Sequence, residues 1–279
     1  MTSSSATWFI TGTSSGFGRV LTEKLLARGD RVAATLRKPH ALDDLKARYG
    51  GRLWVASLDV TDTAAVRSVV NRAFAELGRI DVVVNNAGYG LIGAGEEVSD
   101  DQIQHQLDTN LIGSIQVIRA ALPHLREQGG GRVLQISSAG GQITFPSLSL
   151  YHASKWGIEG FVETVAQEVA PFNITFTIVE PGATQTQFGS SLVAAQPMPV
   201  YDATPVGDIR RAFAANAFPI VGDAAKMAQA MIDCATRSPP PLRLALGSDT
   251  YTGVRAALVS RLNALDAQKE IAFASDADA

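Results

Sequence analysis

Tyr151 and Lys155 are the two residues whose types and spacing best suit the transfer of a proton. They begin a helical pattern, and a separation of one turn puts both side chains on the same face of a helix. Tyrosine has an ordinary pKa of ~10, so it is a weak base at neutral pH unless a nearby positive charge favours the phenolate. We therefore predict that Tyr151 donates or accepts a proton and that the ammonium of Lys155 assists it.

Ser138 follows the apolar strand pattern Val133 to Ile136, so we expect its hydroxyl at the carboxyl end of a strand. Ligands bind at such ends in doubly wound sheets. There Ser138 can hold a carbonyl oxygen while Tyr151 protonates the alkoxide that forms as a hydride arrives at the carbon. Both residues are thus predicted substrate contacts. Taken singly, each residue type more often has an ordinary structural role.

A glycine-rich loop, Thr11 to Gly18, lies between the first strand pattern and a helix pattern. Glycine lets the backbone come close to phosphates, and the following helix offers N–H groups and positive dipole charge to them. The spacing Gly-x-x-x-Gly-x-Gly differs from the common dinucleotide fingerprint, and such a loop also fits an ordinary strand-to-helix turn. The residues that we expect at a pyrophosphate are Gly12, Ser14, Ser15, Gly16, Phe17 and Gly18.

Arg37 and Lys38 follow the second strand pattern, at the place where a carboxylate would bind the adenosine ribose of NAD. No carboxylate stands there to repel a 2′-phosphate, and a guanidinium binds phosphate well. The sequence therefore favours NADP(H) over NAD(H). The competing interpretation is that both residues are solvated loop charges.

Taken together, these motifs resemble the short-chain dehydrogenase/reductase family, whose Thr-Gly-x-x-x-Gly-x-Gly, Asn-Asn-Ala-Gly, Ser, Tyr-x-x-x-Lys and Pro-Gly elements occur here in order. The resemblance covers about residues 7–186. It implies a Rossmann-type fold and a hydride transfer between NADP(H) and a carbonyl or secondary alcohol. The segments Ala34 to Arg37 and Val179 to Gly182 are similar to the branch that contains hydroxysteroid and retinol dehydrogenases.

Further site residues follow from this resemblance. It implies that Asn110 is a fourth catalytic residue, whose backbone carbonyl holds a water that links Lys155 to solvent. It also implies an adenine-contacting pair, a motif that borders the cofactor and a segment at the nicotinamide, in addition to Tyr151 and Lys155: Asp59, Val60, Asn86, Ala87, Gly88, Pro181, Gly182, Thr184 and Thr186. Without the family, these are turn residues and Asn110 is a local helix irregularity.

The elements that must position these residues are short β-branched runs that alternate with helical patterns. Their nearly continuous hydrophobicity predicts parallel strands with helices on both faces, and so a three-layer, doubly wound α/β sheet. Helix patterns between them complete right-handed crossovers, one of them a long helix capped by Ser99 or Asp100 and running through Leu125. The expected strands are Trp8–Thr11, Arg31–Thr35, Leu53–Ser57, Asp81–Val84, Arg132–Ser137, Ile174–Val179 and Leu242–Leu246.

The chain of 279 residues fits a single domain with an elaborated end. We expect an N-terminal tail over 1–6, a cofactor-binding and catalytic core over 7–186 and a substrate loop or lid over 187–222. Closing helices and a last strand would occupy 223–268, and a tail 269–279. Apolar residues near the expected pocket favour Phe145 and Phe188 as substrate contacts, with Leu148 and Met198 beside them.

Composition excludes several classes of partner. A net charge of −3 without a basic stripe argues against nucleic acid, and no segment suits a bilayer or a signal peptide. The single cysteine, Cys234, fits a buried position and a reducing cytoplasm. We assign no metal ligands, and we expect a small-molecule substrate and a homodimer or homotetramer.

Two other functions remain open from the sequence. A sensor that binds NADP(H) without catalysis would keep the glycine loop and Arg37, but it would not need Tyr151 and Lys155. An NAD-dependent epimerase or dehydratase also uses Tyr-x-x-x-Lys, but its glycine spacing differs and its substrate domain is larger. The substrate itself cannot be chosen from these residues.

Overall fold

Seven parallel strands form one central sheet in the computed structural model, which describes residues 5–186, 189, 192–215 and 217–277. The strand order is β3-β2-β1-β4-β6-β7-β9, so the direction of winding reverses between β1 and β4. This is the doubly wound sheet expected from the continuous apolar runs. The strands are β1 (Thr7–Thr11), β2 (Arg31–Leu36), β3 (Leu53–Ser57), β4 (Val82–Asn85), β6 (Gly131–Ile136), β7 (Ile174–Pro181) and β9 (Arg243–Leu246).

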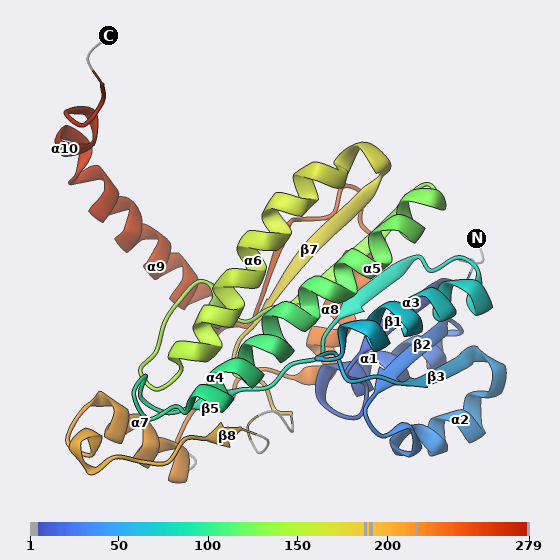
Figure 1. Ribbon diagram of the computed structural model, residues 1–279, viewed down its shortest axis with the longest axis horizontal. Coiled ribbons are helices and arrows are strands. Elements are labelled where there is room, and N and C mark those ends of the chain that lie inside the picture. Colours follow the sequence, from blue (N-terminus) through green and yellow to red (C-terminus); the bar gives the residue numbers. More distant parts are fainter. Residues whose placement is uncertain (1–4, 187–188, 190–191, 216, 278–279) are drawn as a thin grey trace.

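Helices cover both faces of the sheet and make three layers (Figure 1). One face packs against α3 (Thr63–Leu77), α5 (Gly113–Glu127) and α6 (Ser149–Val169). The other packs against α1 (Gly16–Arg28), α2 (Asp43–Tyr49) and α8 (Ala224–Thr236). Short 3-10 turns join several elements: η1 (Pro39–Leu42), η2 (Gly50–Arg52), η4 (Ala139–Gly141), η5 (Ala170–Phe172) and η7 (Pro199–Tyr201).

The C-terminal segment leaves the body of the molecule. Helix α9 (Ser248–Asp266) begins against β9, and α9 and α10 (Lys269–Phe273) then extend away from the sheet (Figure 1). The expected tail from residue 269 therefore begins as a short helix. None of the helices in the described ranges is long and apolar enough to cross a membrane.

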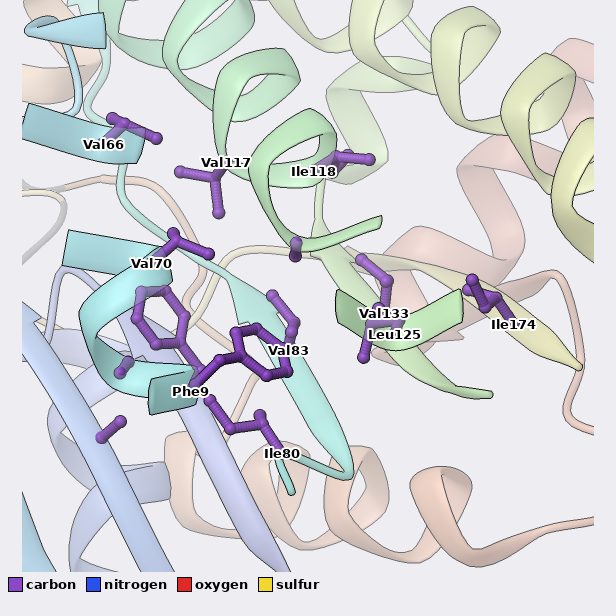
Figure 2. Packing of buried hydrophobic residues seen from close by; sticks show 14 of the residues in the cluster. Phe9, Val66, Val70, Ile80, Val83, Val117, Ile118, Leu125, Val133 and Ile174 are labelled. Carbon is purple, nitrogen blue, oxygen red and sulfur yellow. The ribbon is translucent and has the colours of Figure 1, made fainter. Parts of the chain in front are cut away.

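The core on the α3, α5 and α6 face shows why these sequences form these layers (Figure 2). Phe9 of β1 and Val83 of β4 point from the sheet towards Val117 of α5 and Val66 and Val70 of α3, and all five are buried. Burying a side chain of this size stabilises the fold by about 2 kcal/mol. Because these apolar side chains are buried between the sheet and the helices, the helices pack over the strands. This packing also sets the positions of the strand ends, where ligands bind.

The long helix expected through Leu125 is interrupted. Ser99, one of the two caps expected from the sequence, caps α4 (Asp100–Leu107) with a capping box. The turn η3 (Asp108–Ile112) is then a π-helix, in which the N–H of Gly113 donates to the carbonyl of Asp108. Such a turn holds one residue more than an α-turn and leaves carbonyls without their usual partner. Asn110 lies inside this turn.

The region 187–222 contains more structure than a plain loop. A second, two-stranded sheet joins β8 (Val193–Ala194) to β5 (Leu91–Ile92), and α7 (Pro205–Ala214) follows. The buried carboxylate of Glu97 fastens this region, because it accepts hydrogen bonds from the N–H of Met198 (2.7 Å) and from Arg210 Nη2 (2.7 Å). Phe188, a predicted substrate contact, lies outside the described residues.

Candidate active site

Ser138, Tyr151 and Lys155 lie together at the carboxyl end of β6. Ser138 follows β6, and α6 carries the other two residues on its buried face. The hydroxyl groups of Ser138 and Tyr151 share a hydrogen bond. Lys155 Nζ lies 5.6 Å from the centre of the Tyr151 ring and donates to the carbonyl of Ile136 (3.0 Å). A hydroxyl, a phenol and an ammonium therefore lie close together.

Burial dominates the protonation of both α6 residues. It raises the pKa of Tyr151 to about 12, although the hydrogen bond with Ser138 opposes the rise. Burial lowers the pKa of Lys155 to about 8, and the negative charge of Glu159 opposes that fall. Both residues are thus shifted towards their neutral forms, because each charged form loses its hydration. Tyr151 is a neutral phenol near pH 7, which suits an acid.

Asn110 uses its side chain to hold the loop after β4. Its Nδ2 donates to the carbonyl of Tyr89 (2.8 Å) and to Ser154 Oγ (3.3 Å), and its Oδ1 accepts from the N–H of Tyr89 (3.0 Å). A Cβ on Gly88 would lie 3.2 Å from the same Oδ1, so Gly88 permits this approach. The side chain is structurally occupied, which leaves the backbone of the π-turn for any chemical role.

The glycine loop is fastened by the motif that follows β4. Asn86 Nδ2 donates to the carbonyls of Thr11 (2.8 Å) and Gly12 (3.1 Å). Gly12 has a φ of +70°, and a Cβ there would lie 2.9 Å from Cα of Ala87. A Cβ on Gly18 would lie 2.3 Å from the carbonyl oxygen of Gly12. Side chains at either glycine are excluded, so the loop and the Asn motif pack backbone to backbone.

The start of α1 suits an anion. Ser15 caps the helix without a side-chain hydrogen bond, and its first turn contains no acidic residue. A cavity of about 370 Å³ opens here, lined by Ser14, Ser15, Gly16, Arg19, Val20, Gln185, Thr186 and Ala224. It joins the glycine loop to the segment after β7, two regions that the sequence assigned to the pyrophosphate and to the nicotinamide of one cofactor.

The segment from Pro181 to Thr186 is held by hydrogen bonds to residues that do not line the cavity. The N–H of Gly182 donates to the carbonyl of Leu246 (2.9 Å), and the N–H of Ala183 donates to Asp249 Oδ2 (2.8 Å). Thr184 pairs with Gly222 in a β-bridge, and its hydroxyl donates to the carbonyl of Gly182 (2.8 Å). Thr186 lies at the cavity wall, and Phe17 lies at the start of α1.

Arg37 and Asp59 lie at the ends of β2 and β3, beyond the glycine loop. Burial would raise the pKa of Asp59, but hydrogen bonds from Thr61 and the charge of Arg37 lower it below its ordinary value. Ser57 Oγ donates to the carbonyl of Arg37 (3.3 Å). Arg37 and Lys38 are both exposed, and Val60 is buried. Two cations are therefore accessible at the strand end that binds adenosine ribose in this type of sheet.

Comparison with known proteins is consistent with this geometry. The family model described as short chain dehydrogenase matches residues 6–197. The chain belongs to the short-chain dehydrogenase family. Such an enzyme is an oxidoreductase that acts on CH–OH or C=O groups with a nicotinamide cofactor.

Relatives of this dehydrogenase match most of its length. Oxidoreductase BOA17 of Botryotinia fuckeliana is 40% identical over 91% of this chain and 93% of its own. A short-chain dehydrogenase of Streptomyces avermitilis is 39% identical in structure comparison, with a TM-score of 0.91 over 98% of this chain and 100% of that one. Human 17-beta-hydroxysteroid dehydrogenase type 1 is 35% identical over 72% of this chain and 63% of its own.

His152 of this dehydrogenase is a site residue that sequence analysis did not find. Its Nε2 accepts from the N–H of Phe145 (2.9 Å), so its Nδ1 carries the proton donated to the carbonyl of Gly140 (2.8 Å). Burial lowers the pKa of His152, which favours this neutral form. His152 thereby holds the loop that carries Phe145, which is half exposed, against the start of α6. Its position directly after Tyr151 was the available signal.

Arg19 was also missed, although it lines the cavity at the start of α1. Its guanidinium is paired with Glu23 (2.5 Å) and with Asp44. Asp44 of α2 holds it on the α2 side of the dehydrogenase, and Glu23 is its neighbour one turn along α1. The sequence shows a basic residue one position after the glycine loop, but it does not show which way the side chain of that residue points.

Proposed function

We propose that this dehydrogenase reduces a carbonyl, or oxidises the corresponding secondary alcohol, with NADP(H), and that Tyr151 is its general acid or base. The observation that carries the proposal is the convergence of Ser138, Tyr151 and Lys155. The hydrogen bond between the two hydroxyls and the nearby ammonium are what proton transfer to an alkoxide requires.

Each protein group has a distinct part in the reaction. Ser138 donates to the carbonyl oxygen and orients it, and Tyr151, whose pKa is raised to about 12, gives its proton to that oxygen as negative charge develops. Lys155 stabilises the phenolate that remains. A water held by a backbone carbonyl of the π-turn at Asn110 then returns the proton from solvent. The nicotinamide cofactor, when bound, supplies or accepts the hydride.

The residues fit a bound dinucleotide. The cavity of about 370 Å³ at the start of α1 and the exclusion of any Cβ at Gly18 suit a pyrophosphate close to backbone N–H groups. We assign Thr184 and Thr186 to the nicotinamide end, and Asp59 and Val60 to the adenine. The remaining proposed contacts are Gly12, Ser14, Ser15, Gly16, Phe17, Asn86, Ala87, Gly88, Pro181 and Gly182.

NADP(H) is the proposed cofactor because of the charges at the end of β2. Arg37 is exposed beside Asp59, and Lys38 follows it. A guanidinium in this place binds a 2′-phosphate, and the strand end itself carries no carboxylate to oppose it.

We propose an apolar carbonyl compound as the substrate. Phe145 and Met198 are large apolar side chains that are 48% and 38% exposed, on the loop that His152 holds and in the region that Glu97 fastens. Exposed apolar groups beside a site favour an apolar ligand. One relative is named for steroid oxidation, which is in line with this class.

Two further statements complete the proposal. We expect the enzyme to work in the cytoplasm as a homodimer or homotetramer. Gel filtration with light scattering would test the second statement, and a monomer at micromolar concentration would contradict it.

The decisive experiment is a panel of ketones and aldehydes assayed with NADPH and with NADH. We expect oxidation of NADPH that depends on the carbonyl and a higher kcat/KM with NADPH than with NADH. Binding of NADPH without turnover on any carbonyl would favour a sensor. Conversion of a sugar nucleotide with no net change in the nicotinamide would favour an epimerase.

A further inference from the structure

Three consecutive residues at the end of β6 each contact a different side chain of α6. The first and third contacts involve Lys155 and Tyr151, but the middle one involves a residue with no assigned role, Glu159. In order along the chain, the contacts join Ile136 O to Lys155 Nζ (3.0 Å), Ser137 Oγ to Glu159 Oε1 (2.5 Å) and Ser138 Oγ to the Tyr151 hydroxyl.

Glu159 is buried, with 2% of its surface exposed, and its carboxylate is held from three elements. Besides Ser137, it accepts from Gln142 Nε2 (2.5 Å), which lies just after η4. It also accepts from Arg243 Nη1 (2.6 Å) on β9. A Cβ on Gly141 would lie 1.8 Å from Glu159 Oε1, so the loop after Ser138 packs directly on this carboxylate.

The charges around Glu159 come from Arg243 with its other carboxylate partners and from Lys155. Arg243 contacts two buried carboxylates, Glu159 and Glu180 of β7, and Glu163 Oε1 (2.9 Å), whose side chain is 43% exposed. Burial and the charge of Glu159 raise the pKa of Glu180, which favours its neutral form, whereas Glu163 is solvated. Arg243 therefore compensates the charge of Glu159 directly. The ammonium of Lys155 lies one turn before Glu159 on α6, close enough for the charge of Glu159 to oppose the loss of its proton.

We propose that Glu159, clamped by Arg243, is a positioning residue for the reaction. Through Ser137 it fixes the strand end that carries Ser138, and its charge keeps Lys155 protonated beside Tyr151. This inference rests on the proposed function only for its kinetic consequence. The effect on Lys155 follows from the geometry whatever the substrate is.

The titratable and charged groups that bear on this effect come from three elements. Tyr151, Glu159 and Glu163 share α6 with Lys155, whereas Glu180 belongs to β7 and Arg243 to β9. Removing a negative charge makes loss of a proton easier at both Lys155 and Tyr151. The sign is therefore the same whichever of the two groups limits the rate at high pH.

The test compares Glu159→Gln with the matched control Glu163→Gln. Both variants remove one carboxylate partner of Arg243, but Glu163 is solvated whereas Glu159 is buried. Lysine side chains labelled with ¹³C are titrated by NMR, and the Lys155 signal is assigned by its loss in Lys155→Met. We expect the pKa of Lys155, about 8 in the natural chain, to fall by about half a unit in Glu159→Gln. Glu163→Gln should leave it unchanged.

Kinetics on a carbonyl found in the panel give the second measurement. In Glu159→Gln we expect kcat to fall about 10- to 100-fold, because the strand end that carries Ser138 is displaced. The alkaline limb of the pH–rate profile should move to lower pH, while the affinity for NADPH is retained. Circular dichroism and thermal melting show whether each variant is folded.

Equal behaviour of the two variants, with the Lys155 titration unmoved in both, would overturn the role of Glu159. If no carbonyl is turned over but the Lys155 titration shifts in Glu159→Gln alone, the electrostatic coupling stands and the proposed function fails. If Glu159→Gln does not fold, Arg243→Lys is the second variant, since it keeps the charge but loses the fork of contacts. It should lower kcat with little change in the pKa of Lys155, and unchanged kcat would contradict the clamp.

Discussion

Lys155 Nζ lies 5.6 Å from the centre of the Tyr151 ring, and both side chains are almost wholly buried. Burial moves their pKa values in opposite directions, to about 8 for the ammonium and about 12 for the phenol. Each residue therefore keeps the form with less charge over a wider range of pH than it does in water. The candidate site holds a neutral acid beside a cation that is costly to bury, and this arrangement can be tested in several ways.

Replacing Tyr151 with Phe removes the proposed proton donor and little else from the packing. We expect kcat to fall about 1,000-fold, since general acid catalysis contributes about that much. Fluorescence titration with NADPH should give an affinity close to that of the natural chain. Turnover at the natural rate would refute the assignment of Tyr151.

Replacing Lys155 with Met should abolish turnover and stabilise the fold near neutral pH. Lys155 has a folded pKa of about 8 against 10.5 in the unfolded chain, so the unfolded state binds more protons between those values. The stability of the natural chain therefore rises with pH across that window, by up to about 3 kcal/mol from this group. Met does not titrate, so its advantage should shrink over the same window.

Thermal melting of both proteins at about pH 7 and about pH 9.5 measures this difference, and the second value stays below the titration of Tyr151. The two melting temperatures should be further apart at the lower pH. If the difference between the two melting temperatures is the same or larger at the higher pH, burial does not destabilise the charged form of Lys155.

Replacing Arg37 with Ala should weaken NADPH binding about 10- to 100-fold, because a charge-assisted contact to phosphate is lost. NADH lacks that phosphate, so its affinity should change little. Arg48→Ala is the control, because Arg48 is a basic residue of α2 whose guanidinium lies over the ring of Tyr49. Equal losses for NADPH and NADH in Arg37→Ala would argue against a 2′-phosphate site.

Two glycines on helices should respond to Ala in opposite ways. A Cβ on Gly18 would lie 2.3 Å from a carbonyl oxygen, so Gly18→Ala should destabilise the protein by about 2 kcal/mol and weaken cofactor binding. A Cβ on Gly160 of α6 meets nothing within 4 Å, so Gly160→Ala should stabilise it by about 0.5 kcal/mol. Denaturant unfolding measures both, and a tolerated Gly18→Ala would contradict the close packing of the loop.

The sheet and its layers could be predicted because buried parallel strands have continuous apolar sequences. The expected strand Leu53–Ser57 has the observed bounds, and the other expected strands lie within two residues of theirs at each end. Ser99 was one of two residues that the sequence offered as the cap, and the structure selects it over Asp100. Without the family, the sequence indicates a local irregularity at Asn110, but it does not indicate a π-turn over Asp108–Ile112.

Features that depend on distant partners were not found from the sequence. β5 and β8 have two residues each, too few to show any periodicity. Pro205 was interpreted as part of a loop, but it is the first residue of α7, where its missing N–H costs nothing. Glu159 has the pattern of a solvated helix residue, and only contact with Arg243, far along the chain, explains its burial.

The π-turn at Asp108–Ile112 has a consequence for what this chain can lose. A shortening by one residue there would let α4 and α5 join as one regular helix without turning Val117 and Ile118 of α5 away from the sheet. Such a shortened protein would keep its core and gain regular hydrogen bonds, yet it would lose the turn that places the Asn110 side chain against the loop after β4. The extra residue thus costs the helix regular hydrogen bonds and places Asn110 where its side chain holds Tyr89.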